Sequence, residues 1–212
     1  MSQGHAADTE ARGMGTLHRL LESDGTAAHA YATSLAGVRA PTRDLGDAVH
    51  ALCSVHGHHP DLLTIAATGE ADGGSRDWLA QASTAFADDR AALARLVAAS
   101  GPLPSTPGQA EASAAMTAQR HALEMLARSE RTGVALGAAA ALIADWQTVR
   151  TVMTRAADRF GVDLVLPALP DPADLVADIP ERAMSFGAQQ LLAQHRGLWG
   201  LLEARSSARG QD

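Results

Sequence analysis

The chain has 212 residues, enough for one domain with a substantial core, and its net charge at pH 7 is −7. Its 17 basic residues are all Arg and lie scattered among 24 acidic ones, whereas nucleic-acid binding needs a concentrated positive patch. No apolar run reaches the ~20 residues of a membrane-spanning helix, and the N-terminus lacks the apolar core of a secretory signal. The single cysteine, Cys53, fits a reducing compartment, so we expect a cytoplasmic protein with no nucleic-acid and no membrane partner.

The amino-acid composition favours helices. About a fifth of the chain is Ala, and aromatic residues make up only 3%. Ala, Leu, Arg, Glu and Gln are good helix formers, while the β-branched and aromatic residues that favour strands are scarce. The composition therefore predicts an all-α fold.

The first part of the chain predicts a tail and three helical pieces. Residues 1–9 are polar, and we expect them to be a disordered tail. Two helical pieces follow, and we place a break near Gly25 because Asp-Gly favours a turn. The next helix covers 42–56, and His56 falls within its apolar stripe. That stripe consists of Leu45, Ala48, Val49, Leu52 and Val55.

The middle of the chain predicts a short helix, a loop and a long helix. The short helix covers 60–67, and the Gly-rich, acidic stretch 68–75 has the composition of a mobile loop. A helix that begins at Ser75 or Asp77 then runs to residue 100, with Arg90 inside its apolar stripe.

A capping signal opens the next helix. Thr106-Pro-Gly-Gln109 has the pattern of a capping box, with Thr106 as the N-cap and Gln109 three residues later. We place a helix boundary at Thr132, because one unbroken helix to Phe160 would exceed ~75 Å.

The stretch 133–160 predicts the central helix of a bundle. Its first half is Ala-rich, with Gly133 and Gly137 four residues apart, so neighbouring helices can approach its backbone closely. Larger side chains follow on one helical face, namely Leu142, Trp146, Val149, Met153, Ala156 and Phe160.

The last part of the chain predicts a crossing segment and a final helix. Residues 162–172 are Pro-rich and extended rather than part of a sheet. Asp178 to Glu181 forms a second capping signature, and the helix that follows ends near Arg205, with 206–212 as a frayed tail. The result is a single-domain bundle at 10–205 of about six helices, up-and-down with a long Pro-rich crossover before the last helix.

Five polar side chains lie on, or next to, apolar stripes: His56, Arg90, Glu111, Asp145 and His195. In one interpretation they are structural, with Arg90 paired to Asp145 or Glu111 and each His bonded to a backbone carbonyl or a hydroxyl. In the other, His56, His195, Asp145 and Glu111 converge as ligands of iron, manganese or zinc in a redox protein.

Ferritin-like di-iron proteins place Glu-x-x-His on two helices. The nearest forms here are Asp47-Ala-Val-His50 and the reversed His121-Ala-Leu-Glu124, so the chain resembles ferritin-like proteins in architecture at most. A further alternative is haem or another tetrapyrrole between helices, with His56 or His195 as its axial ligand.

No catalytic or cofactor motif stands out in the sequence. We therefore expect a non-enzymatic binding or interaction module, with a second copy docked on the Ala-rich face or another protein as its partner. A metal-binding redox protein and a haem-binding protein are the alternatives. His58 and His59, in the turn after 42–56, could also bind metal adventitiously, as a purification tag does.

Overall fold

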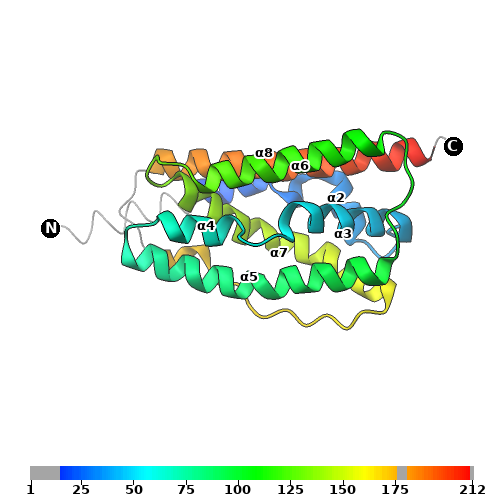
Figure 1. The fold of residues 1–212 in the computed structure, drawn as a ribbon, viewed down its shortest axis with the longest axis horizontal. Helices are drawn as coiled ribbons and strands as arrows, with labels where there is room; N and C mark the ends of the chain where they lie inside the picture. Colours follow the sequence, from blue (N-terminus) through cyan, green and yellow to red (C-terminus); the bar gives the residue numbers. More distant parts are fainter. Residues whose placement is uncertain (1–14, 176–180, 211–212) are drawn as a thin grey trace.

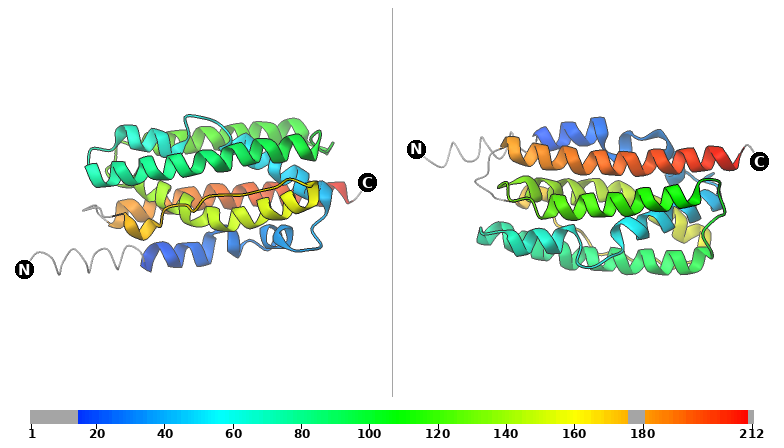
Figure 2. Two further views of the ribbon diagram at one scale, coloured as in Figure 1. Left: turned by 90° about the horizontal axis from the view of Figure 1, so that it is seen from below. Right: turned by 45° about the horizontal axis from the view of Figure 1, so that its top comes forward.

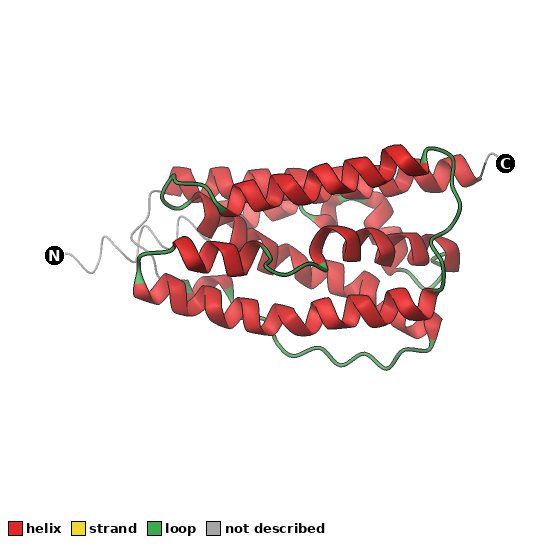
Figure 3. Cartoon of the chain, in the orientation of Figure 1, coloured by secondary structure: helices red, strands yellow, loops and turns green. Residues whose placement is uncertain are grey.

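A computed structural model describes residues 15–175 and 181–210, and within them the fold is all-α with no strand (Figures 1 and 3). A helical segment at 15–24 precedes the labelled elements. These are η1 (Thr26–Ala28), α2 (Ala30–Ala36), α3 (Thr42–His56), α4 (Leu62–Gly69), α5 (Gly73–Ser100), α6 (Gln109–Ala127), α7 (Val134–Phe160), η2 (Pro172–Asp174) and α8 (Glu181–Arg209). The described residues thus contain more helices than the six expected. The expected tail 1–9 and most of the capping signature at 178–181 lie outside them.

Helix α7 is the centre of the bundle. It contacts every helix from α2 to α6 as well as α8, and 16 of its 27 residues are buried. In Figure 2 the segment 15–24 and α2 lie on the opposite side of α7 from α5. The Ala-rich stretch 138–141 is at most 3% exposed. This stretch packs inside the molecule and is not available as an Ala-rich dimer face, and the dimer itself stays a prediction.

Helices α7 and α8 cross at two glycines. A Cβ added to Gly137 would lie under 3.0 Å from the carbonyl oxygen of Met184, and one added to Gly187 would lie equally close to that of Val134. Real Cβ atoms do not approach oxygen so closely. The two glycines therefore allow the backbones to touch, as the Gly and Ala content of 133–141 predicts.

Two predicted boundaries are confirmed and one is displaced. The chain breaks at Gly25, and α6 and α7 are separate helices on either side of Thr132. The predicted loop 68–75, however, shrinks to three residues between α4 and α5. The Asp72 carboxylate accepts a hydrogen bond from the Ser75 N–H at 2.8 Å, and this N-cap allows α5 to begin at Gly73.

The Pro-rich segment after α7 runs along the outside of the bundle in extended form (Figure 3). Its carbonyl oxygens accept hydrogen bonds from side chains of α5 and α7: Arg95 to Asp163, Arg150 to Pro167 and Trp78 to Asp171. The segment is therefore fixed through its backbone as well as through the buried Leu169. Among the residues described, no helix has the length and apolar character needed to cross a membrane.

Candidate functional site

A buried carboxylate lies where η1, α7 and α8 meet. Asp145 of α7 accepts three hydrogen bonds of 2.6 Å: from the N–H and the hydroxyl of Thr26, and from Nδ1 of His195 on α8. Asp145 and His195 are each 2% exposed. The Trp199 indole N–H donates to the Thr26 hydroxyl at 3.0 Å, which extends the network by one residue.

The electrostatics of this site keep Asp145 ionised. Burial raises the pKa of its carboxyl, but the hydrogen bonds from His195 and Thr26 and the charge of His195 outweigh burial, so the pKa lies below its ordinary value. An ionised carboxylate also fixes the neighbouring imidazole, because it requires a proton on Nδ1 of His195. The Nε2 atom of His195 therefore points away from Asp145 with its lone pair free when the ring is neutral.

A second buried imidazole lies beside the first. His56, at the end of α3, packs against His195 with ring centroids 5.0 Å apart and planes at 90°, and against Trp146 at 4.9 Å. Within the described part of the chain, neither Nε2 atom has a hydrogen-bond partner. Burial, followed by the charge of His195, holds the pKa of His56 well below its usual range, so His56 is neutral at pH 7.

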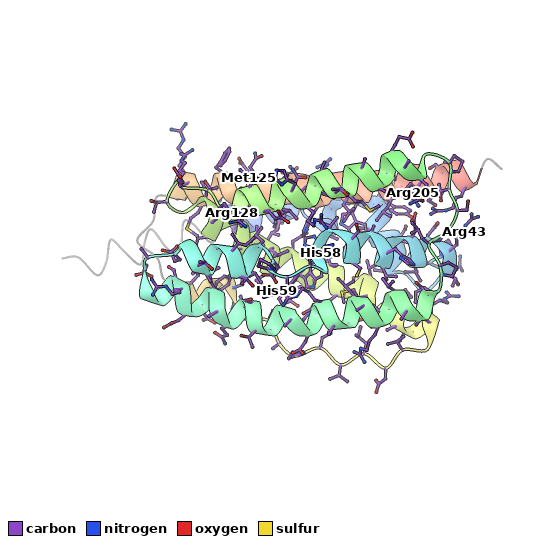
Figure 4. All side chains as sticks on the ribbon, viewed as in Figure 1. Arg43, His58, His59, Met125, Arg128 and Arg205 are labelled. Carbon is purple, nitrogen blue, oxygen red and sulfur yellow. The ribbon has the colours of Figure 1, made fainter. Side chains whose placement is uncertain are left out.

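A small pocket connects His56 with the surface. Its volume is about 30 Å³, and it lies between the α3–α4 turn, α5, α6 and α7. The exposed His58 lines its outer end, where Nε2 accepts a hydrogen bond from Arg120 at 2.8 Å (His58 is labelled in Figure 4). A water molecule needs about 10–15 Å³ of such volume, so the pocket has room for one or two waters.

Two further ion pairs flank the imidazoles. Asp89 of α5 is fully buried and accepts hydrogen bonds from the Trp146 indole N–H at 3.0 Å and from Nε of Arg150 at 2.9 Å. Arg90 pairs with Asp61, which also caps α4. The predicted pairing of Arg90 with Asp145 or Glu111 is wrong. Thr26 of η1 already donates hydrogen bonds to the Asp145 carboxylate, and Asp61 lies at the start of α4, within reach of Arg90.

The predicted site residues thus separate into two groups. The structure brings His56, His195 and Asp145 together, whereas Glu111 is exposed on the first turn of α6. The expectation that each His bonds a backbone carbonyl or a hydroxyl is wrong for His195, whose Nδ1 partner is a carboxylate. Among the described residues, no group of three or more His, Cys, Asp or Glu side chains has the arrangement of a metal site.

Sequence reasoning missed a buried network between α3 and α8. Arg205 forms a two-point ion pair with Asp47, with contacts of 2.8 and 2.9 Å, and Arg209 pairs with Asp44 and Asp47 at 2.6 Å each. These groups hold residues 206–209 in α8, so the expectation that these four residues belong to a frayed tail is wrong. On the helical wheel of α3, Asp47 lies on the side away from the apolar stripe, and nothing in that local pattern indicates that α8 covers this side.

The same network replaces the predicted capping box. Helix α6 begins at Gln109 behind Gly108, which has a left-handed conformation and no side-chain cap. The hydroxyl of Thr106 accepts a hydrogen bond from Arg209 at 3.0 Å, and the Gln109 side-chain oxygen accepts one from Arg205 at 3.0 Å. Buried guanidinium groups thus use the oxygens that would otherwise cap the helix.

An open groove of about 550 Å³ lies near one end of the bundle. Helix α4, the turn before α5, the end of α6 and the start of α7 form its walls. Ile65 and Leu136 supply buried apolar surface, and Arg128 and Arg131 lie in the α6–α7 turn (Arg128 is labelled in Figure 4).

The fold and these sites define an all-α bundle with an ionised, hydrogen-bonded core and an open groove at one end. Residues 21–210 match the model of DUF6975, a family of unknown function, and the chain belongs to this family. No curated protein and no solved structure matches the sequence.

Proposed function

We propose that this protein is a non-enzymatic binding module, and that its ligand site is the groove between α4 and the α6–α7 turn. The proposal depends on the size and lining of this groove, which has a volume of about 550 Å³, an apolar floor and a charged rim. Pockets for small molecules typically have about 300–1,000 Å³ and combine an apolar lining with a few polar groups.

The charges of the rim favour an acidic ligand. Glu70 is already engaged, since its carboxylate accepts hydrogen bonds from the backbone N–H groups of Ala71 and Asp72. Arg128 and Arg131 are both exposed and line the groove, and the Arg131 guanidinium lies 5.8 Å from the centre of the Phe186 ring. Although Glu130 also lines the groove, two guanidinium groups over an apolar floor suit a small apolar molecule that carries a carboxylate.

The buried core supports a binding role more than a catalytic one. The Asp145–His195 pair could orient a general base, but both residues are 2% exposed, and the pocket that reaches His56 has about 30 Å³. A tetrapyrrole needs far more room, so this geometry gives no support to haem. The ferritin-like architecture stays a prediction.

A groove-filling substitution tests the proposal. Thr68 is exposed on α4, lines the groove, and donates its hydroxyl to the carbonyl of Thr64 one turn earlier. Thr84 on α5 is exposed in the same way, donates to Ala80, and does not line the groove. Thr68→Trp and Thr84→Trp are therefore a matched pair.

The assay is a ligand-observed NMR screen of aliphatic and aromatic carboxylic acids against the wild type and both variants. We expect the acids that bind the wild type to bind Thr84→Trp equally and Thr68→Trp at least tenfold more weakly. The proposal is wrong if no carboxylate binds, or if binding is the same for both tryptophan variants.

A further inference from the structure

Two imidazole nitrogens in the core, Nε2 of His56 and Nε2 of His195, are placed where a ligand could bind them. Each is buried, and among the described residues neither has a hydrogen-bond partner. A buried polar atom without a partner loses its hydration and gains nothing in return, so nearly all such atoms in proteins are paired. The two atoms lie on adjacent rings, and a pocket that leads to the surface reaches the ring of His56, so together they indicate a partner other than the chain itself.

The hydrogen bonding of both rings suits a cation, since Nδ1 of His195 contacts Asp145 and, among the described residues, neither Nε2 atom has a partner. Asp145 holds the proton of His195 on Nδ1, so Nε2 is the ring nitrogen that can bind a metal, as in the carboxylate–histidine pairs that orient metal ligands. Neutral imidazole is a preferred ligand of zinc, copper and nickel.

The spacing of the rings also suits one ion. A Zn–N distance of about 2.0–2.1 Å puts each ring centroid roughly 3.2 Å from the metal, so centroids 5.0 Å apart correspond to an angle of about 100° at the ion. This angle is close to that of a tetrahedral site.

We propose that His56 and His195 bind one divalent transition-metal ion through their Nε2 atoms, with water from the adjoining pocket as the remaining ligands. Asp145 acts as a positioning residue rather than as a ligand, since its carboxylate already accepts bonds from Thr26 and His195. Its negative charge balances part of the charge of the ion. The ion enters through the pocket past His58, and Glu111 takes no part.

Zinc is the probe for this site. Untagged wild-type protein, treated with EDTA and then freed of it, is titrated with Zn²⁺ by isothermal calorimetry at pH 7.5. We expect one ion per chain, no stoichiometric binding for His56→Gln or His195→Gln, and an affinity about 10–100-fold weaker for Asp145→Asn, the typical effect of losing an outer partner of a ligand. The matched controls His59→Gln and His121→Gln, at exposed positions that do not line the pocket, are expected to bind like the wild type.

A second measurement covers the case in which the core variants do not fold. In wild-type protein labelled with ¹⁵N at histidine, one equivalent of Zn²⁺ is expected to shift the Nε2 resonances of His56 and His195 while the Nδ1 proton of His195 stays in place. The proposal is overturned if the folded wild type binds no stoichiometric zinc, or if zinc shifts only the resonances of His58 and His59. Neither outcome bears on the groove, which the carboxylate screen tests separately.

Discussion

Replacing Thr26 by Val removes one hydroxyl from the centre of the buried network and keeps the shape of the side chain. Thr26 is 1% exposed, and its hydroxyl donates to Asp145 at 2.6 Å while it accepts the indole N–H of Trp199 at 3.0 Å. The backbone N–H of Thr26 still reaches Asp145 in the variant. The substitution therefore tests the hydroxyl alone.

The expected loss of stability follows from the two bonds. A hydrogen bond to a charged group contributes about 1.5–3 kcal/mol, and an indole N–H left unsatisfied in the core costs about 1–3 kcal/mol. The two effects share one atom and do not add fully, so we expect the unfolding free energy to fall by about 2–5 kcal/mol. Such a loss is a large part of the stability of an ordinary domain, about 5–15 kcal/mol.

Urea unfolding at pH 7, followed by tryptophan fluorescence, measures this loss. Thr26→Ser keeps the hydroxyl and is expected to retain most of the stability. Thr33→Val, which removes an exposed hydroxyl bonded to the carbonyl of His29, is expected to change stability by less than about 0.5 kcal/mol. A loss below about 1 kcal/mol for Thr26→Val, when a bond to an ionised carboxylate alone contributes more, would refute the inference that the network stabilises the core.

Three further predictions concern packing, pH and the C-terminus. Gly187→Ala is expected to destabilise the protein by about 1–3 kcal/mol, because the added Cβ meets the backbone of α7. Gly197→Ala in the same helix has free space around the added Cβ and should stabilise the protein by about 0.5–1 kcal/mol. Thermal unfolding compares the two variants, and equal effects would contradict the close crossing of α7 and α8. Folding lowers the pKa of His56 below its ordinary value of 6.5, so the unfolded chain takes up a proton at a higher pH than the folded protein does. The contribution of neutral His56 to stability is therefore fully present above pH 6.5 and is lost as the pH falls toward the folded-state pKa. The free energy of unfolding falls by at most about 1.4 kcal/mol per pH unit over this range. Urea titrations between pH 8 and about 5 should show this loss in the wild type and a flatter profile in His56→Gln, and parallel profiles would exclude His56 as its source. Deletion of 206–212 removes Arg209 and its bonds to the buried Asp47, and we expect a loss of about 2–4 kcal/mol in urea, whereas a frayed tail could be removed without effect.

The sequence by itself determined the helices. Composition favoured an all-α fold, and the spacing of apolar residues located the stripe of α3 and identified α7 as the central helix. The break at Gly25 and the boundary at Thr132 followed from turn residues and from the length limit of a compact domain. These features are local, because a helical wheel and a turn depend only on residues within a few positions of each other.

Only the tertiary structure decided how the buried polar groups pair. His56, Asp145 and His195 could be recognised as polar residues on apolar faces, but their partners could not, since Asp145 and His195 are 50 residues apart and Asp47 and Arg205 are 158 apart. Which carboxylate meets which cation depends on helix order and crossing angles, which single-helix patterns do not contain.

The predicted capping box at Thr106 is an example of a local sequence pattern that a long-range contact overrides. The local pattern was present, yet Arg209, 103 residues away, binds the threonine hydroxyl in the folded protein. A neutral capping bond contributes about 1 kcal/mol, and a bond to a buried guanidinium contributes about 1.5–3 kcal/mol. The long-range partner therefore replaces the local one, and only the packing of α8 against α3 and α6 brings it within reach.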